Sequence, residues 1–167
     1  MKINKTFFRY LAYTLMLIIL YVLEATPNLL PVIFGSKPML LIPLALSISA
    51  REDYVASIVF SALCGIFIDI SSIGAVGYFA IALTLAGYIQ TDIFKKYIIP
   101  SLFSSTIYSV ISISVVICLY FLLFKVMLGI DGCSALFVNH YISRIVYTVL
   151  CFVPIYFING FLFKRLQ

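Results

Sequence analysis

Six apolar segments follow one another along almost the whole chain, and no other feature constrains the fold as strongly. Polar residues are confined to short stretches between them, so that 64% of the 167 residues are apolar and only 10% are charged. A soluble domain has about 25% charged residues, which excludes a soluble fold. We expect one all-α membrane domain over residues 1–167, with six transmembrane helices at 10–23, 38–50, 54–70, 75–89, 98–124 and 141–163.

The second of these segments is unusually short for a membrane span. Its 13 residues, 38–50, make a helix about 20 Å long, whereas the hydrocarbon core of a bilayer is about 30 Å thick. We therefore expect a short span that is partly buried by its neighbours. Residues 29–34 before it, interrupted by Pro31, are expected to lie in the membrane interface or to dip back into the bilayer against protein.

The lysines and arginines between the segments predict the orientation of the chain. Basic residues gather on the cytoplasmic side of membrane proteins, and eight of the 11 bases lie inside if both termini are cytoplasmic. The eight are Lys2, Lys5, Arg9, Arg51, Lys95, Lys96, Lys164 and Arg165, and the other three are Lys37, Lys125 and Arg144. We interpret the basic surplus as an orientation signal, and we expect no nucleic-acid partner.

Small residues recur on one face of three of the segments. They are Ser57, Ser61, Gly65 and Asp69 in the third, Gly77, Ala82, Ala86 and Gly87 in the fourth, and Ser101, Ser105, Ser109 and Ser112 in the fifth. Small residues at such spacing let membrane helices approach closely. These faces either pack the bundle together or dock a partner's membrane helix. In both cases leucine at Gly65 or Gly77 is expected to block helix approach.

Asp69 is the charged residue that most needs an explanation, because a carboxylate at membrane depth is costly. It lies about 22 Å along the third helix, near the expected outer end. Arg144 lies at similar depth at the start of the sixth segment. We hypothesise an Asp69–Arg144 contact that holds the two helices together, with Lys37 or Lys125 as alternative cations. Otherwise Asp69 is solvated at the interface or caps the following turn.

The polar residues form no recognisable catalytic or metal-binding pattern. The single histidine, His140, is expected in an outer loop, and no serine–histidine–aspartate set, zinc motif or phosphate-binding loop can be assembled. The four cysteines lack the C-x₂-C spacing of zinc and redox sites. We therefore expect no enzyme activity, no disulfide, no bound metal and no cofactor. The charged turn 51–53 is interpreted as solvated.

A spaced set of glycines around one aspartate extends over the third and fourth segments. Gly65-Ile66-Phe67-Ile68-Asp69 ends the third, Gly77 follows eight residues after the aspartate, and Gly87-Tyr88 close the fourth. This pattern resembles the rod shape-determining MreD family, which carries G-x-x-x-D at a helix end and a glycine about eight residues later. The length, short loops and basic start are also similar. The turn glycine, Gly74, falls one position later than in many relatives.

The resemblance implies a non-enzymatic role in cell shape, in the bacterial cytoplasmic membrane. MreD proteins belong to the elongasome, where they lie with MreC. That assembly links MreB filaments to peptidoglycan synthesis by a RodA-type polymerase and a penicillin-binding transpeptidase. These proteins and the lipid bilayer are the implied partners. The candidate structural or interaction residues are Ser57, Ser61, Gly65, Asp69, Gly77 and Arg144.

A transport subunit is the alternative. Six spans in a chain of this size are also similar to the substrate-binding S component of energy-coupling-factor vitamin transporters. Because a similar bundle is expected for both families, function has to be argued from the site. S components typically carry an A-x-x-x-A pair on the first helix, whereas here Ala12 is followed four residues later by Met16. A small-molecule cavity would also need several convergent polar groups.

Overall fold

The fold is all-helical over the described part of the chain. The computed structural model describes residues 2–26, 37–71, 77–97, 101–123 and 142–165. These ranges contain six helices, one for each apolar segment, which confirms the all-α prediction. They are α1 (Lys2–Ala25), α2 (Leu41–Ser49), α3 (Tyr54–Ser71), α4 (Tyr78–Lys96), α5 (Leu102–Phe121) and α7 (Ser143–Arg165). The expected interfacial arm, Lys125 and His140 lie outside the described residues.

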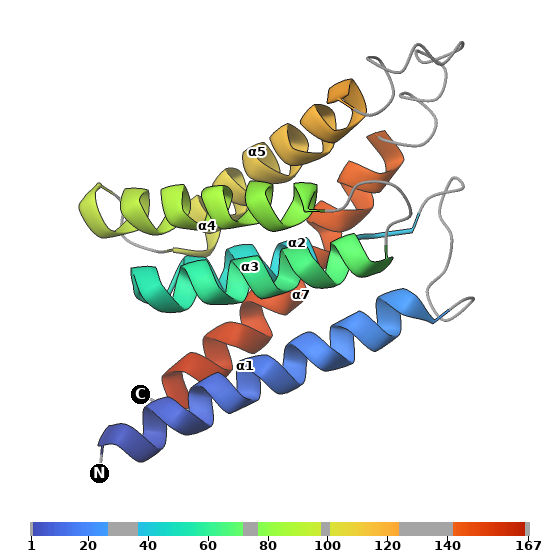
Figure 1. Ribbon diagram of the computed structural model, residues 1–167. Coiled ribbons are helices and arrows are strands. Elements are labelled where there is room, and N and C mark those ends of the chain that lie inside the picture. Colours follow the sequence, from blue (N-terminus) through green and yellow to red (C-terminus); the bar gives the residue numbers. More distant parts are fainter. Residues whose placement is uncertain (1, 27–36, 72–76, 98–100, 124–141, 166–167) are drawn as a thin grey trace.

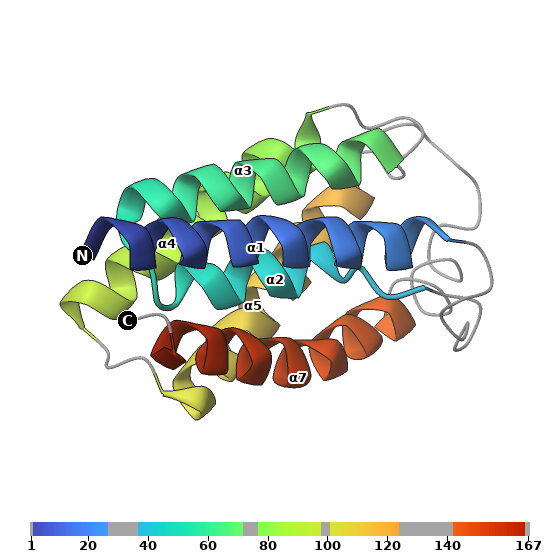
Figure 2. The ribbon, with the colours of Figure 1, turned by 90° about the horizontal axis from the view of Figure 1, so that it is seen from below.

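Successive helices run in opposite directions. The start of α1 and the end of α7 therefore lie at the same end of the bundle (Figures 1 and 2). We call this the proximal end and the opposite one the distal end. Helices α1, α3 and α5 run from proximal to distal, and α2, α4 and α7 run back.

Helix α2 is the centre of the bundle. All nine of its residues are buried, and α3, α4 and α7 pack around it. A helix that is apolar on every side is stable when other helices surround it, and Pro43 is tolerated because it falls in the first turn, where backbone N–H groups have no partner within the helix. The helix is about 14 Å long. It was expected to be partly buried, and its enclosure is complete.

The outer faces of the other helices are strongly apolar. The exposed fractions reach 76% for Phe103, 75% for Val55 and 67% for Ile70. Within the described ranges, four helices are long and apolar enough to cross a membrane: Thr6–Ala25, Tyr54–Ser71, Leu102–Phe121 and Ser143–Phe163. Apolar surface of this extent is unfavourable in water, so the arrangement indicates an integral membrane protein with a multi-pass helical bundle.

Helix α4 is longer and more polar than expected. It continues to Lys96, whereas the sequence predicts a span that ends at residue 89. The additional turns are held because the Thr91 hydroxyl donates to the carbonyl oxygen of Ser49 at 2.9 Å, while Asp92 and Lys96 form an ion pair along the helix surface. The extension brings a polar end of α4 against the proximal loop between α2 and α3.

Candidate functional site

Asp69 caps the first turn of α4. Its Oδ1 accepts a hydrogen bond from the backbone N–H of Phe79 at 3.1 Å, and its Oδ2 accepts one from Ala80 at 2.9 Å. The first N–H groups of a helix have no partner within it and carry partial positive charge. The carboxylate, only 8% exposed, therefore has two charge-assisted hydrogen bonds and needs no cation.

The expected contact between Asp69 and Arg144 is corrected by this geometry. Within the described residues, Asp69 makes its hydrogen bonds to α4 and none to Arg144. Of the alternatives that the sequence left open, capping is the one observed, although the cap belongs to the next helix. Two residues at equal depth meet only if their helix faces turn toward each other, and the stripe that contains Asp69 turns toward α4.

Gly65 lets α3 and α4 touch through their backbones. A Cβ atom at this position would lie 2.4 Å from the Cα of Ala80 and 2.5 Å from the carbonyl oxygen of Phe79. These are backbone atoms at the turn that Asp69 caps, so they cannot move aside as a flexible side chain could. Only glycine fits this contact, because it has no side chain.

Gly77 is required for a different reason. It is the N-cap of α4 with a left-handed φ of 88°, and a Cβ atom there would meet no atom within 4 Å. The expectation that leucine at Gly77 blocks helix approach is therefore wrong. The constraint is conformational, since residues other than glycine are strained at positive φ. Because Gly77 has no side chain, Asp69 supplies the capping oxygens that an N-cap side chain provides in other helices.

Substitution of Gly77 by alanine is expected to lower the free energy of unfolding by about 1–2 kcal/mol. The added methyl group has space, so this loss measures only the backbone strain at φ 88°. Gly77→Asn is the matched variant and should recover part of the loss, because asparagine tolerates the left-handed conformation. Titration with SDS in mixed micelles measures both values, and equal stability of Gly77→Ala and the unsubstituted protein would contradict the assignment.

Toward the proximal end, the serines of α3 extend its contact with α4 and also contact α2. The Oγ of Ser57 lies 2.8 Å from that of Ser49 and 3.1 Å from the carbonyl oxygen of Gly87, and the Oγ atoms of Ser49 and Ser61 are 3.1 Å apart. A Cβ atom on Gly87 would lie 2.3 Å from the Ser61 Oγ. The stripe on α3 thus packs inside the bundle, against α2 and α4, where no partner helix can reach it.

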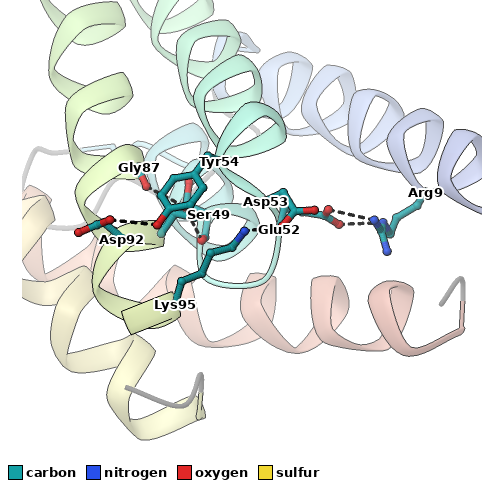
Figure 3. Close-up of polar contacts among 9 residues, drawn as sticks. Arg9, Ser49, Glu52, Asp53, Tyr54, Gly87, Asp92 and Lys95 are labelled. Atoms are coloured by element: carbon teal, nitrogen blue, oxygen red, sulfur yellow. Dashed lines mark hydrogen bonds and ion pairs between the residues drawn. The ribbon is translucent and has the colours of Figure 1, made fainter. Parts of the chain in front are cut away.

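A buried ion pair joins α1 to the proximal loop (Figure 3). The Nε of Arg9 lies 2.8 Å from Oε1 of Glu52 and its Nη2 donates to Oε2 at 3.0 Å, while the Tyr13 hydroxyl donates to Oε1 at 3.0 Å. Glu52 is 4% exposed, so the interpretation of this turn as solvated is wrong for it. Burial raises the pKa of the Glu52 carboxyl, although Arg9 and the Tyr13 hydrogen bond act in the opposite direction.

The neighbouring residues of the same loop are held to α4. Asp53 is exposed and bonds to Lys95, which lowers the pKa of the Asp53 carboxyl through the hydrogen bond and the charge. The Tyr54 hydroxyl donates to Asp92 at 3.0 Å. No sequence signal predicted these pairs, because the partners are about 40 residues apart and charged turns are normally solvated.

Arg144 lines a cavity of about 550 Å³ at the distal end. Lys37 and Glu24 also line it, and Oε2 of Glu24 accepts hydrogen bonds from the backbone N–H groups of Leu40 at 3.0 Å and Leu41 at 3.3 Å. Glu24 thus caps α2 as Asp69 caps α4. Glu24 was not among the candidate residues expected from the sequence, although its position is similar to that of Asp69: each carboxylate lies within the last three residues of its helix.

The contacts described above hold helices and loops together. In the described ranges, no three histidine, cysteine, aspartate or glutamate side chains are grouped so that they could hold a metal ion. The buried carboxylates Asp69 and Glu52 have their hydrogen bonds inside the bundle. Comparisons with protein-family models, with curated proteins and with solved structures found no match. Function is therefore argued from the site itself.

Proposed function

We propose that this protein is a non-enzymatic scaffold of the bacterial wall-elongation machinery, similar to MreD. The observation that carries the proposal is the junction of α3 and α4. Gly65 and Asp69 on α3 meet the first turn of α4, which begins after Gly77. These are the residues of the MreD resemblance, and each has a structural reason to be there. Helix packing alone therefore accounts for the spacing of these three residues, and no catalytic role is needed to explain it.

The rest of the described bundle also suits a scaffold. A rigid centre around α2 is surrounded by helices with wide apolar faces, of which α1 has the least of its surface buried. Such faces are available to lipid or to the membrane helices of other proteins. In the proposed arrangement the chain spans the cytoplasmic membrane six times with both termini in the cytoplasm. Its partners are an MreC-like protein and, in the same assembly, MreB filaments, a RodA-type polymerase and a penicillin-binding transpeptidase.

The test is depletion of the protein in a rod-shaped bacterium that carries it. We expect the cells to become round and the insertion of new wall, followed with a fluorescent D-amino acid, to lose its pattern along the cylinder. The unsubstituted protein and the exposed-site variant Cys118→Ser should restore both, whereas Gly65→Leu should not. Depleted cells that keep a rod shape and a normal labelling pattern would overturn the proposal.

One observation favours the transport alternative, namely the cavity at the distal end. It has the volume of a small-molecule site, within the usual range of about 300–1,000 Å³, and charged residues on its wall. An S component would retain its vitamin on purification and would associate with a coupling subunit. Mass spectrometry of the purified protein would detect that vitamin, and depleted cells would then fail in vitamin uptake while they keep their shape.

A further inference from the structure

The distal cavity is built by five segments that are far apart in the sequence. Glu24 and Tyr21 come from α1, Lys37 from the segment before α2, Tyr120 from α5 and Arg144 from α7, and Ser71 at the end of α3 adds to the wall. Tyr21 is fixed against Phe67 of α3, with ring centroids 4.9 Å apart. The cavity is therefore a product of the folded bundle, and its shape does not depend on one local turn.

Among the described residues of its wall, positive charge exceeds negative charge. Two cations, Lys37 and Arg144, face one carboxylate, and Oε2 of that carboxylate is occupied by the N–H groups at the start of α2. Among the residues that the structure describes, neither Lys37 nor Arg144 has a hydrogen bond or an ion pair with a carboxylate. Both side chains are partly buried. The charge of Arg144 also acts on the Glu24 carboxyl, so that among the described lining residues one positive charge is left in excess, which favours the entry of an anion.

The residue types and the volume indicate what kind of anion fits. A water molecule occupies about 30 Å³, so a cavity of about 550 Å³ holds far more than a bare ion. Arginine presents a planar fork that matches phosphate oxygens, and lysine adds a compact charge. A phosphate monoester carries a charge of about −1.5 to −2 at neutral pH, which matches two cations.

We propose that the distal cavity binds an organic phosphate, with the phosphate group between Arg144 and Lys37. The phosphate comes either from a lipid headgroup at the membrane surface or from a soluble phosphate ester. The proposal goes beyond the scaffold function and does not rest on it, because a wall-elongation scaffold does not need a ligand. It is tested by binding, whereas the scaffold function is tested by cell shape, so that either can fail alone.

The experiment uses the full chain purified in dodecyl maltoside, a detergent without phosphate. Isothermal titration calorimetry measures the binding of glycerol 3-phosphate, and native mass spectrometry measures the binding of a short-chain phosphatidic acid. The variants are Arg144→Gln and Lys37→Gln. The matched control is Lys95→Gln, which removes the same charge at the proximal end, where Lys95 is exposed and pairs with Asp53. Unfolding midpoints without ligand establish that each variant is folded.

We expect one phosphate probe to bind per chain. Arg144→Gln should weaken this binding at least about tenfold, because it removes charge-assisted hydrogen bonds, and Lys37→Gln should weaken it about three- to tenfold. Lys95→Gln should change it less than about twofold. Binding of glycerol 3-phosphate identifies a soluble ester as the source, whereas binding of phosphatidic acid alone identifies a lipid.

Two results would overturn the proposal. One is the lack of saturable binding for both probes by the folded, unsubstituted protein. The other is an equal loss of binding in Lys95→Gln and Lys37→Gln, which would show that the probe is attracted by the general positive charge of the protein and not by the cavity.

Discussion

Gly65→Leu is expected to separate α3 from α4 and to lower the free energy of unfolding by more than about 4 kcal/mol. The Cβ atom alone would lie within 2.6 Å of three backbone atoms of Phe79 and Ala80, so α4 has to move away at its first turn. That movement also breaks the hydrogen bonds to Asp69 and opens the contact between Gly87 and the serines. Gly65→Ala carries the same Cβ atom and should already cause most of the loss.

The thiol of Cys64 shows whether this separation opens the packing around α3. Cys64 is fully buried next to Gly65, so it becomes reactive toward a maleimide only if that packing opens. The other three cysteines are first replaced by serine, and labelling is followed in detergent at increasing temperature. The matched control is Ile66→Ala, one residue along on the exposed face of α3. If Gly65→Leu labelled no faster than Ile66→Ala, the close approach of the two helices would be wrong.

The six helices of the described ranges could be predicted in their order because the bilayer imposes a strict rule. Backbone groups in the hydrocarbon region must be bonded within the chain, so each long apolar segment becomes a helix. The shortness of the segment that contains α2 also predicted partial burial by its neighbours, whereas its complete burial at the centre of the bundle was not predicted. Helix ends were less accurate. Helix α4 continues past its predicted end because Thr91 is buried and bonded to Ser49 of α2. A contact between residues so far apart in the sequence leaves no local pattern.

The partners of the charged residues could not be predicted from depth alone. Asp69 and Arg144 are at similar depth, but the rotation of each helix decides which groups meet, and α3 turns Asp69 toward α4. The sequence suggests cations as partners of carboxylates, whereas the backbone N–H groups at a helix start are equally suitable and present at every helix. Glu52 was also expected to be solvated, whereas it is buried and pairs with Arg9 of α1. The local sequence of the turn does not show that α1 lies against it.

The two distal carboxylates give the bundle a repeated construction. Glu24 near the end of α1 caps α2, and Asp69 near the end of α3 caps α4. In each hairpin a carboxylate fixes the start of the returning helix at the distal end. At the start of α4 the bond from Phe79 is buried, so water cannot replace it if the Asp69 carboxylate is removed. The caps therefore set the position of both returning helices relative to the ones before them.

Asp69→Leu is accordingly expected to lower the free energy of unfolding by about 3–4 kcal/mol, because it leaves the buried N–H group of Phe79 and the partly buried N–H group of Ala80 without acceptors, at about 1–3 kcal/mol for a buried group. Asp69→Asn keeps one acceptor oxygen and loses the charge, so its loss should be about 1–2 kcal/mol. SDS titration in mixed micelles measures both, and equal losses in the two variants would contradict the capping role.

A double-mutant cycle with Arg144→Gln separates capping from an ion pair. If Asp69 acts through the N–H groups of α4, the effects of Asp69→Asn and Arg144→Gln add to within about 0.5 kcal/mol, as is usual for residues without shared contacts. If the two side chains formed an ion pair, the double variant would lose clearly less than the sum of the single losses. Additivity is expected, since both oxygens of Asp69 are already bonded to α4 and Arg144 lies on the wall of the distal cavity.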